Sequence, residues 1–189
     1  RRYYNAQCDF KKGLISPDAL QKNLMLMKQL ELEPDHRAVV GPALRKSEKE
    51  GVPAAAIQMQ DGTIVTGKTT ELMNNISSMV LNAVKQLGNI ADEIRLIAPM
   101  VLEPILKLKS SALQELDPIL NIEDVLIALS ISAAMNPMAE VGMEKLKELA
   151  GCEVHSTCML TQVDESILKK LNINLTCEPA YPSKDLYYV

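Results

Sequence analysis

The stretch AAAIQMQDGTIVTGK, residues 54–68, decides which fold this chain is expected to adopt. With Thr69 added, its second half satisfies the phosphate-loop pattern GxxxxGK(S/T) letter for letter. The four variable positions, residues 63–66, are Thr, Ile, Val and Thr. Such residues favour a strand and rarely adopt the positive φ that a loop around a phosphate needs. Because Asp61-Gly62 is also a strong signal for a tight turn, we predict a β-hairpin here.

The sequence after the hairpin alternates between helical and strand patterns. Helices are expected over residues 69–87, 101–113, 123–135, 137–150 and 164–172, the last of them capped by Asp164. Strands are expected over residues 93–99, 152–161 and 173–179. This alternation predicts an α/β fold, a three-layer α/β/α sandwich with a mixed five-stranded sheet made of the hairpin plus three strands. The 123–135 helix is apolar nearly all round, which predicts that it is buried.

Residues 1–50 are predicted to form a small helical segment ahead of the sandwich. Ser16 is expected to cap a helix whose first residue is Pro17. The charged run RKSEKEG ends just before Pro53 and predicts a boundary there. Residues 51–189 would then form the sandwich domain.

The two ends of the chain carry all of its aromatic residues. The chain starts RRYYNAQCDF without a Met, from which we expect a piece of a longer protein. No Phe, Tyr or Trp occurs between Lys11 and Ala180, so the core must be built from aliphatic side chains and Met. We expect the ends to dock on each other or on an absent domain; their aromatics are Tyr3, Tyr4, Phe10, Tyr181, Tyr187 and Tyr188.

The composition is that of an ordinary globular domain. Apolar residues make up 47% of the 189 residues and charged residues 23%. A net charge of −4 argues against a nucleic-acid partner, which would require a basic face. No apolar run is long enough to span a bilayer, and no signal peptide is visible, so the cytoplasm is the expected location and no membrane contact is expected.

Lys68, Thr69 and Thr70 form a candidate anion-binding group. They follow a predicted strand and open a predicted helix, so free amides, hydroxyls and a cation would converge there. The alternative is that Thr69 or Thr70 only caps the helix while Lys68 is solvated. The sequence leaves this choice open.

Cys152-x-x-His155-x-x-Cys158 has the residue types of a zinc site but not the spacing. Side chains alternate along a strand, so the two cysteines point to one face and His155 to the other. We therefore predict no metal and no cofactor. His155 is a candidate general base or a buried hydrogen-bonded histidine, and Asp164 is a second catalytic candidate because it lies at the carboxyl end of a predicted strand.

Several stretches together carry a resemblance to a known family: RRYYNAQCD, DGTIVTGKT, NIADEIRLIAPMVLEPILKLK, DVLIALSISAAMNP, GCEVHST and KKLNINLTCEPAYPSKDLYY. They resemble the C-terminal part of an uncharacterised bacterial protein family of roughly 500 residues, a length that makes room for further domains. The family has a domain of unknown function and is sometimes labelled, without support, an ATP-dependent peptidase. Its members resemble phosphate-loop proteins in their N-terminal part, with a Gly-rich stretch that ends in GSGK. The resemblance thus implies that the nucleotide candidate lies outside this chain.

The predicted order of elements is also similar to the cytidine-deaminase-like sandwich. In that family a His-x-Glu opens the helix after the hairpin, and a Pro-Cys-x-x-Cys follows the next strand. This chain has Thr70-Glu71-Leu72 and Pro99-Met100-Val101 at those positions, so the zinc ligands are absent. The likeness is an analogy of fold only.

Two functions are compatible with the sequence. The first is a non-catalytic assembly or regulatory domain of a larger cytoplasmic protein, with a second copy and the N-terminal domain of the same protein as partners. The second is an enzyme domain that binds a small anionic molecule in a cleft at the carboxyl ends of its strands. Candidate side chains gathered in one pocket would favour the enzyme, and dispersed ones would favour the assembly domain.

Overall fold

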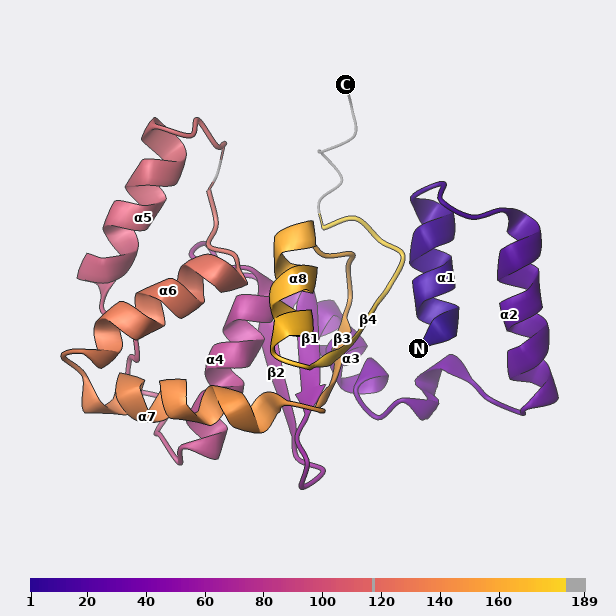
Figure 1. The fold of residues 1–189 in the computed structure, drawn as a ribbon, viewed down its shortest axis with the longest axis horizontal. Coiled ribbons are helices and arrows are strands. Elements are labelled where there is room, and N and C mark those ends of the chain that lie inside the picture. The colour runs from indigo at the N-terminus through magenta and orange to yellow at the C-terminus, as the bar shows by residue number, and fades with distance from the viewer. Residues whose placement is uncertain (117, 183–189) are drawn as a thin grey trace.

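A computed structural model describes residues 1–116 and 118–182 and shows an α/β architecture around one four-stranded mixed sheet (Figure 1). Its strands are β1 (Ala54–Gln58), β2 (Ile64–Lys68), β3 (Glu153–Ser156) and β4 (Asn174–Cys177). They lie in the order β2-β1-β3-β4. β1 is antiparallel to both of its neighbours, and β3 and β4 are parallel. The predicted α/β class and mixed sheet are confirmed.

Eight α-helices surround this sheet in the described residues: α1 (Arg2–Lys11), α2 (Pro17–Gln29), α3 (Val40–Glu50), α4 (Asn75–Leu87), α5 (Pro99–Ser111), α6 (Ile122–Ala133), α7 (Pro137–Lys145) and α8 (Gln162–Lys170). Two short 3₁₀ turns, η1 (Pro34–His36) and η2 (Leu146–Leu149), precede α3 and β3. Within the described part, no helix is long and apolar enough to cross a membrane.

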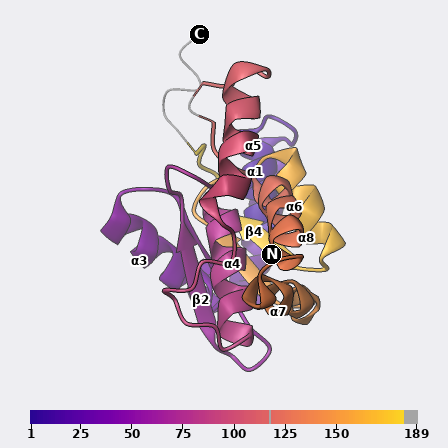
Figure 2. The same ribbon diagram turned by 90° about the vertical axis from the view of Figure 1, so that its left-hand side faces the viewer.

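Helices cover both faces of the sheet. Figure 2 shows α3 on one side of it and α4 on the other, with α6, α7 and α8 beyond α4. The alternation of side chains along β1 explains this arrangement. Ala55 and Ile57 pack into the main core with α4, whereas Ala56 faces the opposite way and packs with Val39 and Ala43. The main core is aliphatic, as predicted; its largest fully buried side chains include Ile57, Ile76, Met79, Leu120, Ile122, Leu129, Leu149 and Leu168.

The predicted fifth strand is wrong, because residues 93–98 form a loop. Leu96 and Ile97 are buried although they lie in a loop, so their apolar side chains resemble the pattern of a buried strand. The carbonyl oxygens of Arg95 and Leu96 instead accept hydrogen bonds from the side chain of Asn136, at 3.2 and 3.3 Å. A side-chain amide therefore satisfies backbone groups that a neighbouring strand would otherwise pair.

Two predicted helix starts are also wrong. α4 begins at Asn75 and not at residue 69, because Asn74 is its N-cap and accepts a hydrogen bond from the Ser77 amide. α8 is capped by Thr161, and Asp164 lies in its first turn. By contrast, α2 starts as predicted, with Ser16 as N-cap and Pro17 as first residue.

The N-terminal segment lies at one end of the molecule, where α1 runs beside β4 and α2 packs on α1 (Figure 1). Arg1 donates to Asn174 Oδ1 at 2.5 Å, and the Cys8 thiol donates to the Cys177 carbonyl at 3.3 Å. Tyr181 packs on the same buried cysteines. The two ends of the described chain thus meet; Tyr187 and Tyr188 lie outside the described residues. The predicted division at residue 50 stays a prediction, and α3 of the lead-in packs on β1 and β2.

Candidate functional site

The GxxxxGKT stretch is a hairpin, as predicted. Gly62 takes φ +87° in the turn, and the following Ile64–Lys68 is β2, paired with β1 along its whole length. The second glycine of the pattern has a packing reason. A Cβ on Gly67 would lie 2.1 Å from the backbone nitrogen of Met79, so only glycine lets β2 approach α4 this closely. Both glycines are therefore explained without a phosphate.

Lys68 and Thr70 line one open pocket, while Thr69 does not. Lys68 Nζ lies 2.5 Å from Glu50 Oε2, and Lys46 binds the other oxygen of the same carboxylate at 2.9 Å. Hydrogen bonds from Lys68 and then Lys46 lower the pKa of Glu50 from 4.5 to about 2. The Thr69 amide donates to the Pro53 carbonyl at 2.8 Å.

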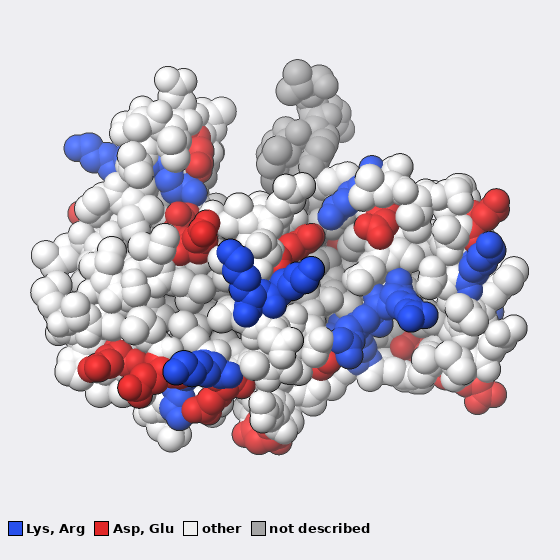
Figure 3. Space-filling model, viewed as in Figure 1, with Lys and Arg blue, Asp and Glu red and all other residues white. Residues whose placement is uncertain are grey.

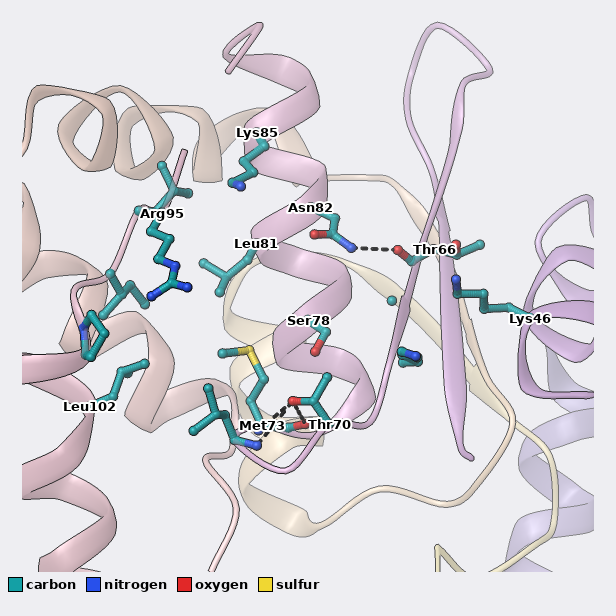
Figure 4. Close-up of a pocket in the computed structure, with 16 residues that line it drawn as sticks. Lys46, Thr66, Thr70, Met73, Ser78, Leu81, Asn82, Lys85, Arg95 and Leu102 are labelled. Carbon is teal, nitrogen blue, oxygen red and sulfur yellow. Dashed lines mark hydrogen bonds between the residues drawn. The ribbon is translucent and has the colours of Figure 1, made fainter. Parts of the chain in front are cut away.

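Thr70 stabilises a turn and does not cap α4. Its hydroxyl oxygen accepts from the amides of Leu72 and Met73, at 3.3 and 3.1 Å. The helix begins five residues further on, so the amides that were expected beside Lys68 belong to this turn. The pocket is shown with the Thr70 bonds in Figure 4.

The pocket has a volume of about 550 Å³ and runs along β2, across α4 and up to the start of α5. Its lining residues are Lys46, Thr66, Gly67, Lys68, Thr70, Leu72, Met73, Ser78, Leu81, Asn82, Lys85, Arg95, Leu96, Ile97, Pro99 and Leu102. Four of them are cations and none is an acid. The sequence patterns gave no reason to predict that Lys85 and Arg95 share a pocket with Lys68. Lys85 belongs to α4, Arg95 to the loop before α5 and Lys68 to β2.

His155 is fully buried on the other face of the sheet from α4. Its Nδ1 lies 2.9 Å from Thr176 Oγ1, and its Nε2 lies 3.1 Å from Glu178 Oε1. The ring packs on Tyr4, with 4.8 Å between ring centroids. Both ring nitrogens are thus engaged inside the protein, and His155 does not line the pocket with Lys68.

Arg37 completes this network and was not singled out by the sequence. Its guanidinium donates to Thr176 Oγ1 and, at 2.5 Å, to Glu153 Oε2. It also approaches the carbonyls of Val154 and Asn174, at 3.4 and 3.5 Å. A partly buried guanidinium with several acceptors holds adjacent strands together, here β3 and β4.

Asp164 is 1% exposed and lies where the first turns of three helices meet. Its carboxylate accepts from the Asn74 side chain at 3.1 Å, from the Ile122 amide at 3.1 Å and from the Thr161 hydroxyl at 2.7 Å. These groups belong to the starts of α4, α6 and α8. The catalytic roles of His155 and Asp164 stay predictions, and neither residue lies in the pocket that Lys68 lines.

The cysteines behave as apolar core residues. Cys8, Cys152, Cys158 and Cys177 are all buried and are free thiols. Burial raises the pKa of each of them, that of Cys8 to about 11. Cys152 packs in the main core, opposite to His155, as the strand alternation predicts. Among the described residues, no three His, Cys, Asp or Glu side chains are grouped to hold a metal ion.

Fold and pocket together define an α/β domain with a ligand-sized cavity along the free edge of a four-stranded sheet. The family model described as "Domain of unknown function DUF1846, C-terminal" matches residues 35–187. The chain belongs to this family, and the resemblance seen in its sequence motifs is confirmed.

Its curated relatives are longer bacterial proteins. The "UPF0371 protein" of Clostridium botulinum (strain Alaska E43 / Type E3) is 45% identical over 196 residues that cover the whole chain. The "UPF0371 protein" of Clostridium tetani (strain Massachusetts / E88) is 43% identical over the same extent. The chain spans 39% of the length of each of these two relatives.

Proposed function

We propose that this chain is a non-catalytic assembly domain, which docks through α2 onto the N-terminal part of a longer protein of its family. One observation carries this proposal: none of the residues of α2 is buried. The dispersal of Lys68, His155 and Asp164 over three places agrees with it, because a catalytic set would have to share a pocket.

The exposed residues of α2 are those of a docking helix. Met25 and Leu26 on the helix are exposed, the latter to 51%, and Leu30 and Leu32 directly after it are exposed as well, Leu30 to 66%. A helix of 13 residues is marginally stable by itself in water, and most helical stability comes from burying an apolar face. This face is therefore expected to be covered by another protein surface.

The N-terminal part of the longer protein is the occupant that we propose. The family match begins at residue 35, directly after α2, so α1 and α2 lie outside the matched C-terminal domain. The relatives extend well beyond the matched region, which leaves more than half of their length to form further domains. α1 and α2 form a helical hairpin ahead of the matched C-terminal domain, and we expect this hairpin to contact the N-terminal part as well.

The docking is tested by mixing this chain with the separately expressed N-terminal part of the C. botulinum relative and measuring binding by calorimetry. The pair Leu26→Glu and Leu30→Glu should abolish binding. The matched pair Leu108→Glu and Leu113→Glu, equally exposed but on and just after α5 at the other end, should leave it unchanged. No binding by the natural chain, or equal binding by the α2 variant, would refute the proposal.

A second copy of the chain is the partner that we propose for α6. This helix was predicted to be buried on all sides, but Ile127 and Ile131 are about half exposed and Met135 just beyond it is 77% exposed. Spaced four residues apart, these three side chains form one stripe, which pairs well with the same stripe of a second copy about a twofold axis. Figure 3 shows a broad uncharged surface over this helix.

Self-association is tested by light scattering after size exclusion. The natural chain should elute as a dimer, and Ile131→Glu should give the monomer mass of 20.8 kDa. Leu44→Glu, a similar change of an exposed leucine on α3, is the control and should remain dimeric. A monomeric natural chain would rule out this interface.

Two further parts of the proposal concern location and fold. We place the domain in the cytoplasm, an inference supported by its four free thiols, since cytoplasmic proteins keep cysteines reduced. The likeness to the deaminase-like sandwich is proposed for topology alone, although residues 93–98 form a loop and do not supply the strand that the analogy placed before Pro99. The enzyme alternative gains no support from the placement of its candidate residues.

A further inference from the structure

We propose that the pocket between β2, α4 and α5 binds a small amphipathic anion, a carboxylate or phosphate monoester attached to a short apolar chain. The pocket is separate from the docking faces of α2 and α6. Its volume of about 550 Å³ is that of a small-molecule site.

The charge of the lining is the first argument. The described lining contains four cations, Lys46, Lys68, Lys85 and Arg95, and no Asp or Glu, in a chain whose net charge is −4. Lys46 and Lys68 share the single carboxylate of Glu50. Lys85 donates to the backbone carbonyl of Asp92 at 2.8 Å, and no carboxylate of residues 1–116 or 118–182 pairs with its charge. A concentration of cations on an acidic protein favours an anionic ligand.

Arg95 is the cation best placed for such a ligand. Among the described residues, its guanidinium has no hydrogen-bond or ion-pair partner. Figure 4 shows it facing Leu81, on the same side of α4 as Lys85, with Leu102 further below. The side chain of Asn136 donates to the backbone carbonyl of Arg95, which fixes the backbone from which this exposed side chain extends. A planar guanidinium at this place could bind both oxygens of a carboxylate or phosphate.

The free edge of β2 adds further hydrogen-bond donors. Thr63 and Thr69 each form a backbone hydrogen bond across the hairpin. Because every second residue of β2 bonds to β1, Val65 and Gly67 between them also bond to β1. The alternation of an antiparallel ladder therefore turns the backbone amides of Thr66 and Lys68 outward. The Thr66 carbonyl on this edge is already occupied by the side chain of Asn82, at 2.9 Å. Of the backbone groups that Thr66 and Lys68 turn outward, the two amides and the Lys68 carbonyl remain for a ligand, so the edge supplies two donors and one acceptor.

The rest of the lining is apolar and suits the body of the ligand. Leu81 and Leu102 project into the pocket, and Met73 lies below Leu81 (Figure 4). The buried Leu96 and Ile97 form part of the same wall. A simple inorganic anion would leave these side chains in water, whereas a short alkyl chain would cover them.

The proposal is tested by titrating the ¹⁵N-labelled chain with octanoate, octyl phosphate and the neutral octanamide, and following backbone amide shifts. We expect saturable shifts around Thr66, Lys68, Lys85 and Arg95 with at least one of the two anions, and the tighter of them identifies the head group. Octanamide should bind at least tenfold more weakly, because it lacks a charge-assisted hydrogen bond.

Charge-matched variants make the test specific to this pocket. Arg95→Gln and Lys85→Gln should each weaken binding of the anion about tenfold. The controls Arg45→Gln and Lys49→Gln remove exposed cations of α3 that do not line the pocket, and should leave binding unchanged. Equal binding of octanamide and octanoate, equal loss in the control variants, or no saturable shift with either anion would overturn the proposal.

Discussion

The side-chain amide of Asn74 donates hydrogen bonds to both carboxylate oxygens of Asp164, at 3.1 Å each. Asn74 is the N-cap of α4 and Asp164 lies in the first turn of α8, 90 residues away in the chain. The Ile122 amide at the start of α6 binds the same carboxylate. Because helix N-termini favour negative charge, one buried aspartate stabilises three helices together.

Asp164→Asn is expected to destabilise the domain by about 2–4 kcal/mol, since charge-assisted bonds are lost and an amide hydrogen is turned toward donors. The free energy of unfolding in urea measures this effect. Glu165→Gln is the matched control in the same helical turn, where the side chain is 42% exposed; it should cost less than about 1 kcal/mol. Equal losses in the two variants would contradict a special role for Asp164.

Gly67→Ala is expected to cost more than Gly62→Ala. The added Cβ at Gly67 would meet the backbone of Met79 at 2.1 Å, so β2 and α4 would have to separate. At Gly62 the Cβ meets nothing within 4 Å, and only the positive φ of +87° is unfavourable. We expect about 1–2 kcal/mol for the turn glycine and clearly more for Gly67, measured by thermal and urea unfolding. The reverse order would mean that β2 and α4 are not so closely packed.

The ion pair of Lys68 with Glu50 should make stability depend on acid pH. The pKa of Glu50 is lowered from 4.5 to about 2 in the folded protein. A lowered folded pKa gives a stabilisation that is fully present above pH 4.5 and is lost as the pH falls toward 2. Lys68→Met should therefore be less stable than the natural chain at pH 6, and the difference should shrink toward pH 2.

Urea unfolding over this pH range measures that difference. Lys49→Met, which removes a neighbouring exposed lysine of α3, should show no such pH-dependent difference. If the stability difference between Lys68→Met and the natural chain stayed constant from pH 6 to pH 2, the protonation of Glu50 would not be the cause of the pH dependence.

This chain is expected to show no Mg²⁺-dependent binding of ATP, because its GxxxxGKT stretch is a paired hairpin. Native mass spectrometry with ATP, with and without Mg²⁺, tests this expectation. Lys68→Ala should leave the spectra unchanged. A specific Mg-ATP adduct that disappears in the variant would show that residues 62–69 can rearrange into a phosphate loop.

Local signals in the sequence predicted those parts of the fold that depend on neighbouring residues. Asp61-Gly62 between two apolar runs predicted the hairpin, and Ser16 followed by Pro17 predicted the start of α2. The order of helices and strands gave the α/β class. The alternation of side chains along a strand separated His155 from Cys152 without any knowledge of the fold.

Two of the wrong predictions, the strand over residues 93–99 and the start of α4, share one cause. Residues 93–98 have the apolar pattern of a buried strand, but whether a strand forms depends on a pairing partner. Asn136, about 40 residues further on, satisfies the carbonyls of Arg95 and Leu96 instead. α4 was predicted to begin at residue 69 but begins at residue 75 for a similar reason. Asn74 is held by the distant Asp164 and caps the helix there.

The sequence by itself thus determined the hairpin, the α/β class, the aliphatic core and the family, since each rests on short-range patterns or on matching motifs. Only the tertiary structure decided which charged groups meet. It placed Lys68, Lys85 and Arg95 around one pocket, and it enclosed Asp164 among the starts of three helices. The physical reason is that charges and hydrogen bonds act through space, between residues tens of positions apart, and no local pattern records that distance.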